Sequence, residues 1–175
     1  MAQEIQHYFT IFDDDFANFD TQTYDWYLHP VVTPAAIRKI QSIYHLTQDI
    51  NTYNKIFNRI HKVTLDYFTV NFFGRHKGRT FLLALQEEMQ GLTPLNYDNR
   101  ILLNLLHQLK FDLSEFIKFY PYAKNSIISE QKNFNSEHLT VLPATFIYCQ
   151  DDIIKIESFA QRQIFDFLNK KTAER

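Results

Sequence analysis

The sequence predicts an all-α fold, a single compact domain of about six or seven helices. Apolar residues recur at helical spacing over long stretches, most clearly between residues 34 and 73. Thr-Pro pairs at residues 33–34 and 93–94 are typical of helix starts, since a capping hydroxyl there precedes a proline in the first turn. No strand–turn–strand pattern is found, so the expected helix content is well above one third.

Residues 1–32 are interpreted as an acidic, aromatic-rich arm packed on this domain. The apolar residues between Ile5 and Phe12 are at helical spacing, and three aspartates at positions 13–15 interrupt them. An aspartate before a helix accepts hydrogen bonds from free N–H groups, which favours a capping role for this run. Because no EF-hand spacing follows, we expect no metal site.

The central helices are expected between residues 33 and 120. The pattern that Pro34 opens would give a helix of about 60 Å if it ran unbroken to Phe73, about twice a domain diameter. The polar stretch 47–52 therefore divides it into helices near 34–48 and 50–73.

Three shorter helices follow. Thr80 opens one that Gly91 ends, and Pro94 opens the most apolar helix of the chain. Asp112 begins a capping box for a further helix, which is expected to stop at Pro121.

Two segments complete the predicted domain. Residues 121–140 are polar and weakly periodic, and we interpret them as a flexible connection. Residues 141–171 continue a helical row of apolar side chains and are expected to form a C-terminal helix. Within them, residues 144–149 are ambiguous, since their Phe, Ile and Tyr content also favours a strand.

Composition restricts the compartment and the chemistry. Of the 175 residues only one, Cys149, is a cysteine, which excludes a disulfide framework and a cysteine zinc site. No apolar stretch reaches the length of a membrane span, and no signal-peptide pattern is present. We therefore expect a cytoplasmic protein in a reducing compartment, without membrane contact and without a cofactor.

The charges are unevenly distributed along the chain. Residues 1–32 carry six acids and no Lys or Arg, whereas residues 33–79 carry eight bases against two acids. Such separated fields act on the choice of partner rather than on the fold. Because the arm is negative and its rings need apolar cover, we expect it to pack onto the helices of residues 34–73, leaving the Gly74–Arg79 corner free.

That corner, between Gly74 and Arg79, is the loop richest in positive charge. Its cations could simply complement the end of the preceding helix, or they could bind an anion at the start of the next one. The preceding helix extends the positive strip. The candidate residues for binding an anion or a partner are Arg75, His76, Lys77, Arg79, Lys55, Arg59 and Lys62.

Few residues indicate catalysis, since phosphate fingerprints, nucleophile elbows and metal-binding histidine pairs are missing. Arg38 and His45, like Arg100 and His107, are seven positions apart, so each pair would share a helix face. An Arg that holds a phosphate and a His that moves a proton suit metal-free RNA cleavage. This spacing resembles the R-x(4–6)-H signature of HEPN ribonucleases, all-helical proteins, and the resemblance implies a catalytic site at a dimer interface.

The sequence favours a small cytosolic binding or regulatory protein of the inhibitor, adaptor or immunity type, and not an enzyme. Its expected partner is another protein, and an anionic ligand at Gly74–Arg79 is compatible with this. An isoelectric point near 6.4 disfavours nucleic acid. Two alternatives stay open: the HEPN-like ribonuclease, for which a homodimer is expected, and a sensor with an aromatic-lined pocket for an apolar ligand.

Overall fold

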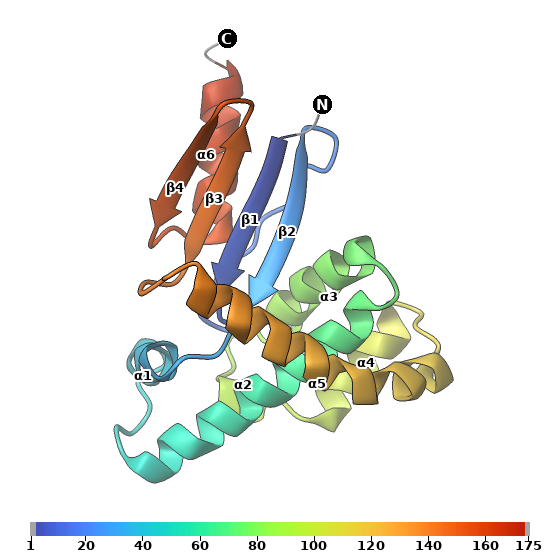
Figure 1. Cartoon of the computed structure of the whole chain (residues 1–175). Helices are drawn as coiled ribbons and strands as arrows, with labels where there is room; N and C mark the ends of the chain where they lie inside the picture. The colour runs from blue at the N-terminus through green and yellow to red at the C-terminus, as the bar shows by residue number, and fades with distance from the viewer. Residues whose placement is uncertain (1–2, 174–175) are drawn as a thin grey trace.

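The two ends of the chain meet in a mixed four-stranded β-sheet (Figure 1). The computed structural model describes residues 3–173. The strands are β1 (Gln3–Phe9), β2 (Tyr24–Pro30), β3 (Ala144–Cys149) and β4 (Asp152–Glu157). The all-α prediction is therefore wrong.

The strand order is β2-β1-β3-β4. β1 is parallel to β2, with Ile5 opposite Trp26, and antiparallel to β3, with Ile5 opposite Ile147. β3 and β4 form an antiparallel hairpin. The sheet thus joins an N-terminal pair of strands to a C-terminal pair.

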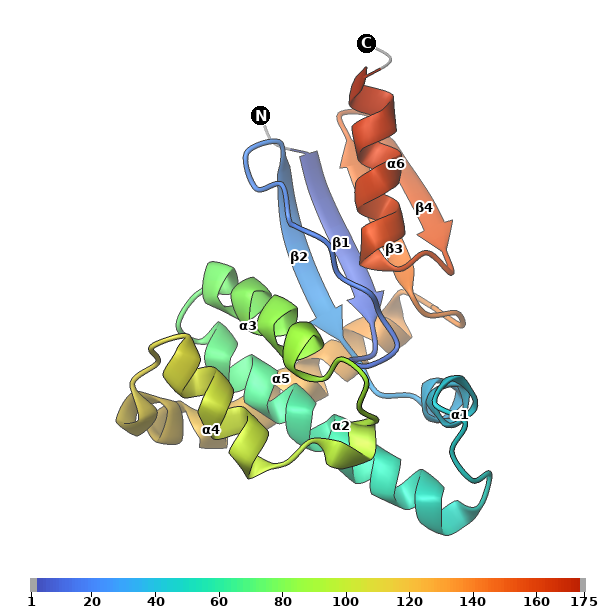
Figure 2. The same ribbon diagram turned by 180° about the vertical axis from the view of Figure 1, so that it is seen from behind.

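One face of the sheet is covered by α6 (Gln161–Ala173), which lies in front of the strands in Figure 2. Ile164 and Leu168 of this helix pack against Ile5, Trp26 and Ile147, and none of the five is more than 4% exposed. Removing apolar surface from water contributes about 25 cal/mol for each Å². Burial of these side chains therefore stabilises the packing of the helix on the sheet.

The residues between β2 and β3 form a helical layer at one end of the sheet (Figures 1 and 2). Its elements are α1 (Pro34–Ile43), α2 (Ile50–Asn71), α3 (Arg75–Glu88), the 3-10 turn η1 (Pro94–Asn96), α4 (Asn99–Gln108) and α5 (Leu113–Ser136). No helix between residues 3 and 173 is long and apolar enough to cross a membrane.

Several helix starts and one break agree with the local signals in the sequence. Thr33 accepts a hydrogen bond from the N–H of Ala36, with Pro34 in the first turn. Asp49 caps α2 through Thr52, so the pattern divides at the predicted polar stretch. These side chains satisfy N–H groups that have no partner inside the helix.

The predicted N-terminal arm is instead the middle and one edge of the sheet. β1 is buried on both faces, so its apolar residues do not alternate, and those between Ile5 and Phe9 also match a helical period. The expected attraction to the helices of residues 34–73 is present in one ion pair, Asp13–Lys39 at 3.0 Å, whereas Asp25 pairs with Arg75 at 3.0 Å, outside these helices. Because Arg75 contacts β2 in this way, the Gly74–Arg79 corner is not free.

Two other segments also differ from expectation. The predicted connection 121–140 is helical up to Ser136, because Pro121 lies inside α5 without ending it. The carbonyl that loses its intrahelical bond there belongs to Ile117, whose side chain is 63% exposed, so water can reach this part of the helix. The predicted C-terminal helix 141–171 contains β3 and β4 before α6 begins, and residues 144–149 are a strand.

Candidate functional site

Buried polar side chains gather at the connection from β1 to β2, residues 10–23, which we call the crossover. Because the two strands are parallel, the chain must return along the sheet between them, and it does so without a helix. The crossover begins at the carboxyl end of β1. Ligands in open α/β sheets bind at such strand ends, and the aspartate run 13–15 lies here.

Asp14 is the centre of this cluster, and its side chain is fully buried together with that of His7. Asp14 Oδ2 lies 2.5 Å from Nε2 of His7. Its Oδ1 accepts hydrogen bonds from the backbone N–H groups of Asp15 and Gln161, both at 2.8 Å. The other ring nitrogen of His7 lies 2.7 Å from Oγ1 of Thr145. The row of three side chains thus ties the crossover to β1, β3 and the start of α6.

A hydroxyl, an imidazole and a carboxylate in a row also occur in nucleophilic triads. Here Thr145 and His7 are both 0% exposed, so a substrate has no route to the hydroxyl oxygen. The arrangement therefore serves to satisfy buried polar groups, and its role is to fix the crossover.

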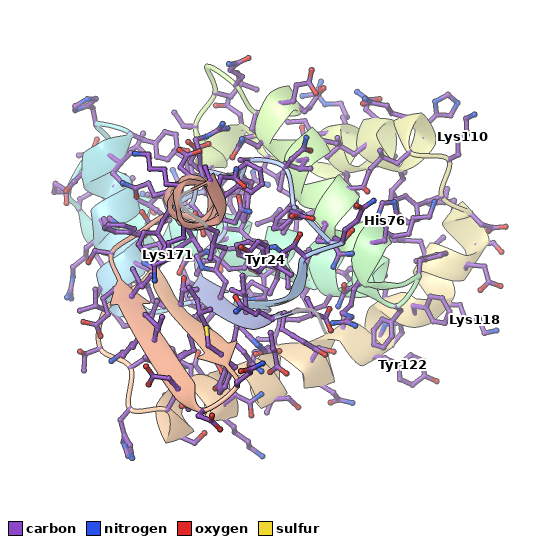
Figure 3. All side chains as sticks on the ribbon, turned by 90° about the horizontal axis from the view of Figure 1, so that it is seen from above. Tyr24, His76, Lys110, Lys118, Tyr122 and Lys171 are labelled. Carbon is purple, nitrogen blue, oxygen red and sulfur yellow. The ribbon has the colours of Figure 1, made fainter. Side chains whose placement is uncertain are left out.

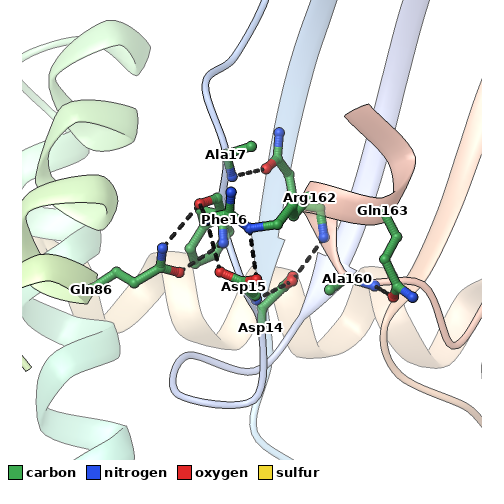
Figure 4. A network of polar contacts seen from close by, with 9 residues as sticks. Asp14, Asp15, Phe16, Ala17, Gln86, Ala160, Arg162 and Gln163 are labelled. Carbon is green, nitrogen blue, oxygen red and sulfur yellow. Dashed lines mark hydrogen bonds and ion pairs between the residues drawn. The ribbon is translucent and has the colours of Figure 1, made fainter. Parts of the chain in front are cut away.

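Further polar contacts hold the crossover between two helices (Figure 4). Asp15 Oδ2 accepts from Nε of Arg162 in α6 at 2.7 Å. The amide of Gln86 in α3 bonds both backbone groups of Phe16, accepting from its N–H at 2.7 Å and donating to its carbonyl at 2.9 Å. The run of aspartates is consequently dispersed, with Asp13 paired to Lys39 and Asp14 and Asp15 facing α6.

A cavity of about 370 Å³ opens beside these contacts, and we call it the crossover cavity. Phe12, Leu85, Met89 and Leu92 contribute apolar wall, and Asp15 and Arg162 lie among its polar lining residues. Its volume is in the range of about 300–1,000 Å³ that is usual for small-molecule sites. Apolar walls with a few polar groups are also typical of such sites.

The seven predicted anion-binding residues do not share one surface. Lys62 pairs with Asp66 at 2.7 Å, and Lys77 lies over the ring of Phe111 at 5.4 Å. Lys55 and Arg59 lie in the first half of α2, away from the α2–α3 corner.

The remaining three lie on the first turns of α3. His76 is exposed on the surface of this helix (Figure 3). Arg75 and Arg79, one turn apart, line the same small cavity against β2. The anion site stays a prediction, and of the seven residues Arg75 and Arg79 are the two that line a common cavity.

The two Arg–His pairs of the ribonuclease alternative differ in whether both residues lie on the same helix. Arg38 is in α1, but His45 follows the end of that helix with a φ of 52°, so the two do not share a helix face. Arg100 and His107 are both in α4, and the Arg100 side chain is 90% exposed and paired with Asp98.

Cys149 ends β3 on the face that α6 covers. It packs at the edge of the apolar cluster formed with Phe167 and Ile154, and it is partly exposed. Its partner in the β3–β4 register is Asp152.

His7, Thr145 and Gln161 were not among the predicted functional residues. The capping interpretation of the aspartate run identified the right chemistry, since Asp14 accepts from the first N–H of a helix. That helix is α6, 147 residues further along the chain, and no local pattern connects the two.

Comparisons with known proteins agree with this architecture. A family model described as thioredoxin matches residues 19–166. The crystal structure of a candidate protein disulfide isomerase from Nitrosomonas europaea superposes with a TM-score of 0.59 at 11% identity, over 100% of both chains. No curated protein matches the sequence.

These findings correct both the fold and the function expected above. The fold is thioredoxin-like, with a mixed four-stranded sheet and helices, and not all-α. The thioredoxin match points to the handling of thiols and disulfides, which replaces the regulatory binding protein. It equally replaces the all-helical ribonuclease and the apolar-ligand sensor.

Proposed function

The chain belongs to the thioredoxin family, and from this membership we propose that it handles thiols or disulfides by binding them. The proposed ligand is a small cysteine-containing peptide held in the crossover cavity. Any oxidation or reduction takes place at the sulfur atoms of the ligand and not at a cysteine of the protein. The observation that carries the proposal is the crossover itself, which has a ligand-sized cavity beside it and no cysteine in it.

Two thiols are needed for a protein to cycle between a dithiol and its own disulfide. The thioredoxin-like redox motif is C-x-x-C near a βαβ unit. The β1–crossover–β2 unit is the parallel crossover of this sheet, and it carries Phe16-Ala17-Asn18-Phe19 and the aspartates. With Cys149 as its single cysteine, the chain cannot complete that cycle by itself.

The cavity lining supports a small, polar, sulfur-containing ligand. Met89 and Phe12 offer the polarisable and aromatic surface against which sulfur packs well. Arg162 and Asp15 provide one cation and one anion for the charged ends of a peptide. Their mutual ion pair is about half exposed, so exchanging it for contacts with a ligand costs little.

Calorimetric titration with reduced and oxidised glutathione tests this proposal. We expect dissociation constants in the micromolar to millimolar range, roughly −8 to −4 kcal/mol. Leu92→Trp should weaken binding, because a larger side chain at this 40% exposed position fills the cavity mouth. Leu103→Trp, a matched change at a 47% exposed leucine of α4, should not.

Two results would contradict the proposal. One is the absence of binding by either form of glutathione. The other is equal binding of the analogue with serine in place of cysteine, which would show that sulfur is not recognised. Cys149→Ser should leave the affinity unchanged, and the wild-type protein should not catalyse the reduction of insulin disulfides by dithiothreitol.

A further inference from the structure

A second cavity, of about 140 Å³, lies between the edge strand β2 and the α2–α3 helix pair. We call it the β2–α3 cavity. Trp26 to His29 of β2 form one wall, and Tyr67, Asn71, Arg75 and Arg79 form the opposite one, with Glu130 of α5 at its margin. The volume is well below the range of about 300 Å³ and above that drug-sized ligands occupy, so it suits a small ion or group.

The charges around this cavity leave one cation without a counterpart. Arg75 is paired with Asp25 at 3.0 Å and lies over the ring of Tyr27 at 4.4 Å. Glu130 is bound to Nδ1 of His29 at 2.7 Å. Arg79 is partly buried and has no hydrogen bond or ion pair with any residue in the described range 3–173. Burial and the neighbouring Arg75 lower the pKa of Arg79, and Tyr67 and Asp25 act in the opposite direction.

A hydroxyl that lines the same cavity also lacks a partner within residues 3–173. Tyr67 is only 2% exposed, lines the cavity, and has no hydrogen bond to its hydroxyl within the described part of the chain. Asn71, one turn further along α2, has a buried side-chain oxygen in the same condition. The Tyr67 hydroxyl can donate a hydrogen bond to a ligand in the cavity, whereas the Asn71 oxygen is an acceptor and does not contribute to binding an anion.

Gly78 permits the close helix approach that forms this wall. A Cβ at this position would lie 2.5 Å from Oδ1 of Asn71 and 3.2 Å from the Tyr67 ring. Because residue 78 has no side chain, α3 can pack directly on these two residues, next to Arg79. The N-terminus of α3 begins three residues earlier, and its free N–H groups add positive potential.

We propose that the β2–α3 cavity binds a tetrahedral oxyanion of phosphate or sulfate size. The Arg79 guanidinium offers a planar fork of donors, and the Tyr67 hydroxyl adds one donor from the neighbouring helix. Arg75 keeps donors beyond the one that Asp25 uses. The oxyanion is either free or the phosphate of a larger molecule that extends out of the cavity. This site is separate from the crossover cavity, so a test of oxyanion binding does not depend on the proposed function.

Titration of the full chain with inorganic phosphate at constant ionic strength tests the proposal, with the Arg79 Nε–H signal followed by NMR. We expect a saturable shift, and Arg79→Gln should weaken binding by roughly tenfold or more, since it removes charge-assisted hydrogen bonds. Tyr67→Phe should weaken it by a smaller factor, on the order of threefold. The control Arg100→Gln changes charge equally at a 90% exposed side chain and should have no effect.

Folding and ligand source are checked in the same series. Without phosphate, Arg79→Gln should keep the wild-type melting temperature, because it breaks no side-chain hydrogen bond or ion pair. Equal binding of phosphate and O-phosphoserine would indicate a phosphate group on a larger molecule, and binding of phosphate alone a free ion. Three outcomes would overturn the proposal: no saturation below about 10 mM phosphate or sulfate, binding of acetate alone, or binding unaffected by Arg79→Gln.

Discussion

The Asp14–His7 pair of the crossover and the polar side chains of the β2–α3 cavity differ in whether the chain itself provides their partners. In the crossover, both oxygens of Asp14 and both ring nitrogens of His7 have partners from the chain itself. In the β2–α3 cavity, Arg79 and the hydroxyl of Tyr67 have none among residues 3–173. In the first region the polar side chains hold the fold, and in the second we propose that they bind a ligand.

The largest effect is expected from breaking the crossover. Asp14→Ala leaves His7 and the N–H of Gln161 without their buried acceptor, and removal of one partner from such a cluster costs about 3–5 kcal/mol. Urea denaturation measures this loss. Asp15→Ala is the control, since its ion pair with Arg162 is about half exposed and worth about 0–1 kcal/mol. Equal losses for the two variants would mean that the buried cluster does not hold the crossover.

Asp66 in α2 is an intermediate case, because only one of its two carboxylate oxygens has partners within residues 3–173. Its contribution to stability is expected to depend on pH. Lys62 and Tyr97 both donate to its Oδ2, but its buried Oδ1 has no partner. Burial raises the pKa of this carboxyl, with Lys62 acting in the opposite direction. A raised folded-state pKa means that its contribution to stability is fully present below the ordinary value of 3.8 and is lost as pH rises through the folded-state pKa.

Asp66→Asn should therefore gain stability relative to wild type as pH rises from about 4 to 7. Denaturation at several pH values measures this change. Asp98 provides a control of opposite sign, since the hydrogen bond from Ile101 lowers its pKa. The stabilisation from Asp98 is present above pH 3.8 and lost as pH falls, so Asp98→Asn should lose stability relative to wild type as pH rises. Parallel curves for the two variants would contradict the burial argument for Asp66.

The smallest stability effect is expected at Gly78. Alanine in a helix interior gains about 1 kcal/mol over glycine, but its Cβ must displace Asn71 and crowd the Tyr67 ring. We expect the two terms to cancel within about 1 kcal/mol by thermal denaturation, while phosphate affinity falls because the cavity wall moves. In Gly91→Ala the added Cβ meets nothing within 4 Å and the φ of 78° is strained, so that variant should lose stability and keep its affinity. Unchanged phosphate binding in Gly78→Ala would contradict the role of this wall.

Several helix starts between residues 34 and 136 were predictable, because their signals are local, but the continuation of α5 through Pro121 was not. Thr33, Asp49 and Asp112 each cap a helix through an N–H three residues later, and such caps are visible in the sequence. The sheet was not predictable in this way. The pairing of β1 with β3 joins residues as far apart as Tyr8 and Ala144, and no local pattern encodes it.

The candidate sites follow the same division. Arg75 and Arg79 were identified from a local cluster of charge, and they do share a cavity. Thr145 and Gln161 could not be identified, because they reach Asp14 and His7 only through the closed sheet. The aspartate run was visible, but its partners were not.

The strand order also has a consequence for synthesis on the ribosome. β1 leaves the ribosome well before β3, which pairs with it and is made more than 130 residues later. At about 5–20 residues per second, that interval is on the order of ten seconds. During this time the helical layer is being made, and the edge of β1 that faces away from β2 has no partner. An unpaired apolar edge is a template for aggregation, so the nascent chain needs protection there until β3 arrives.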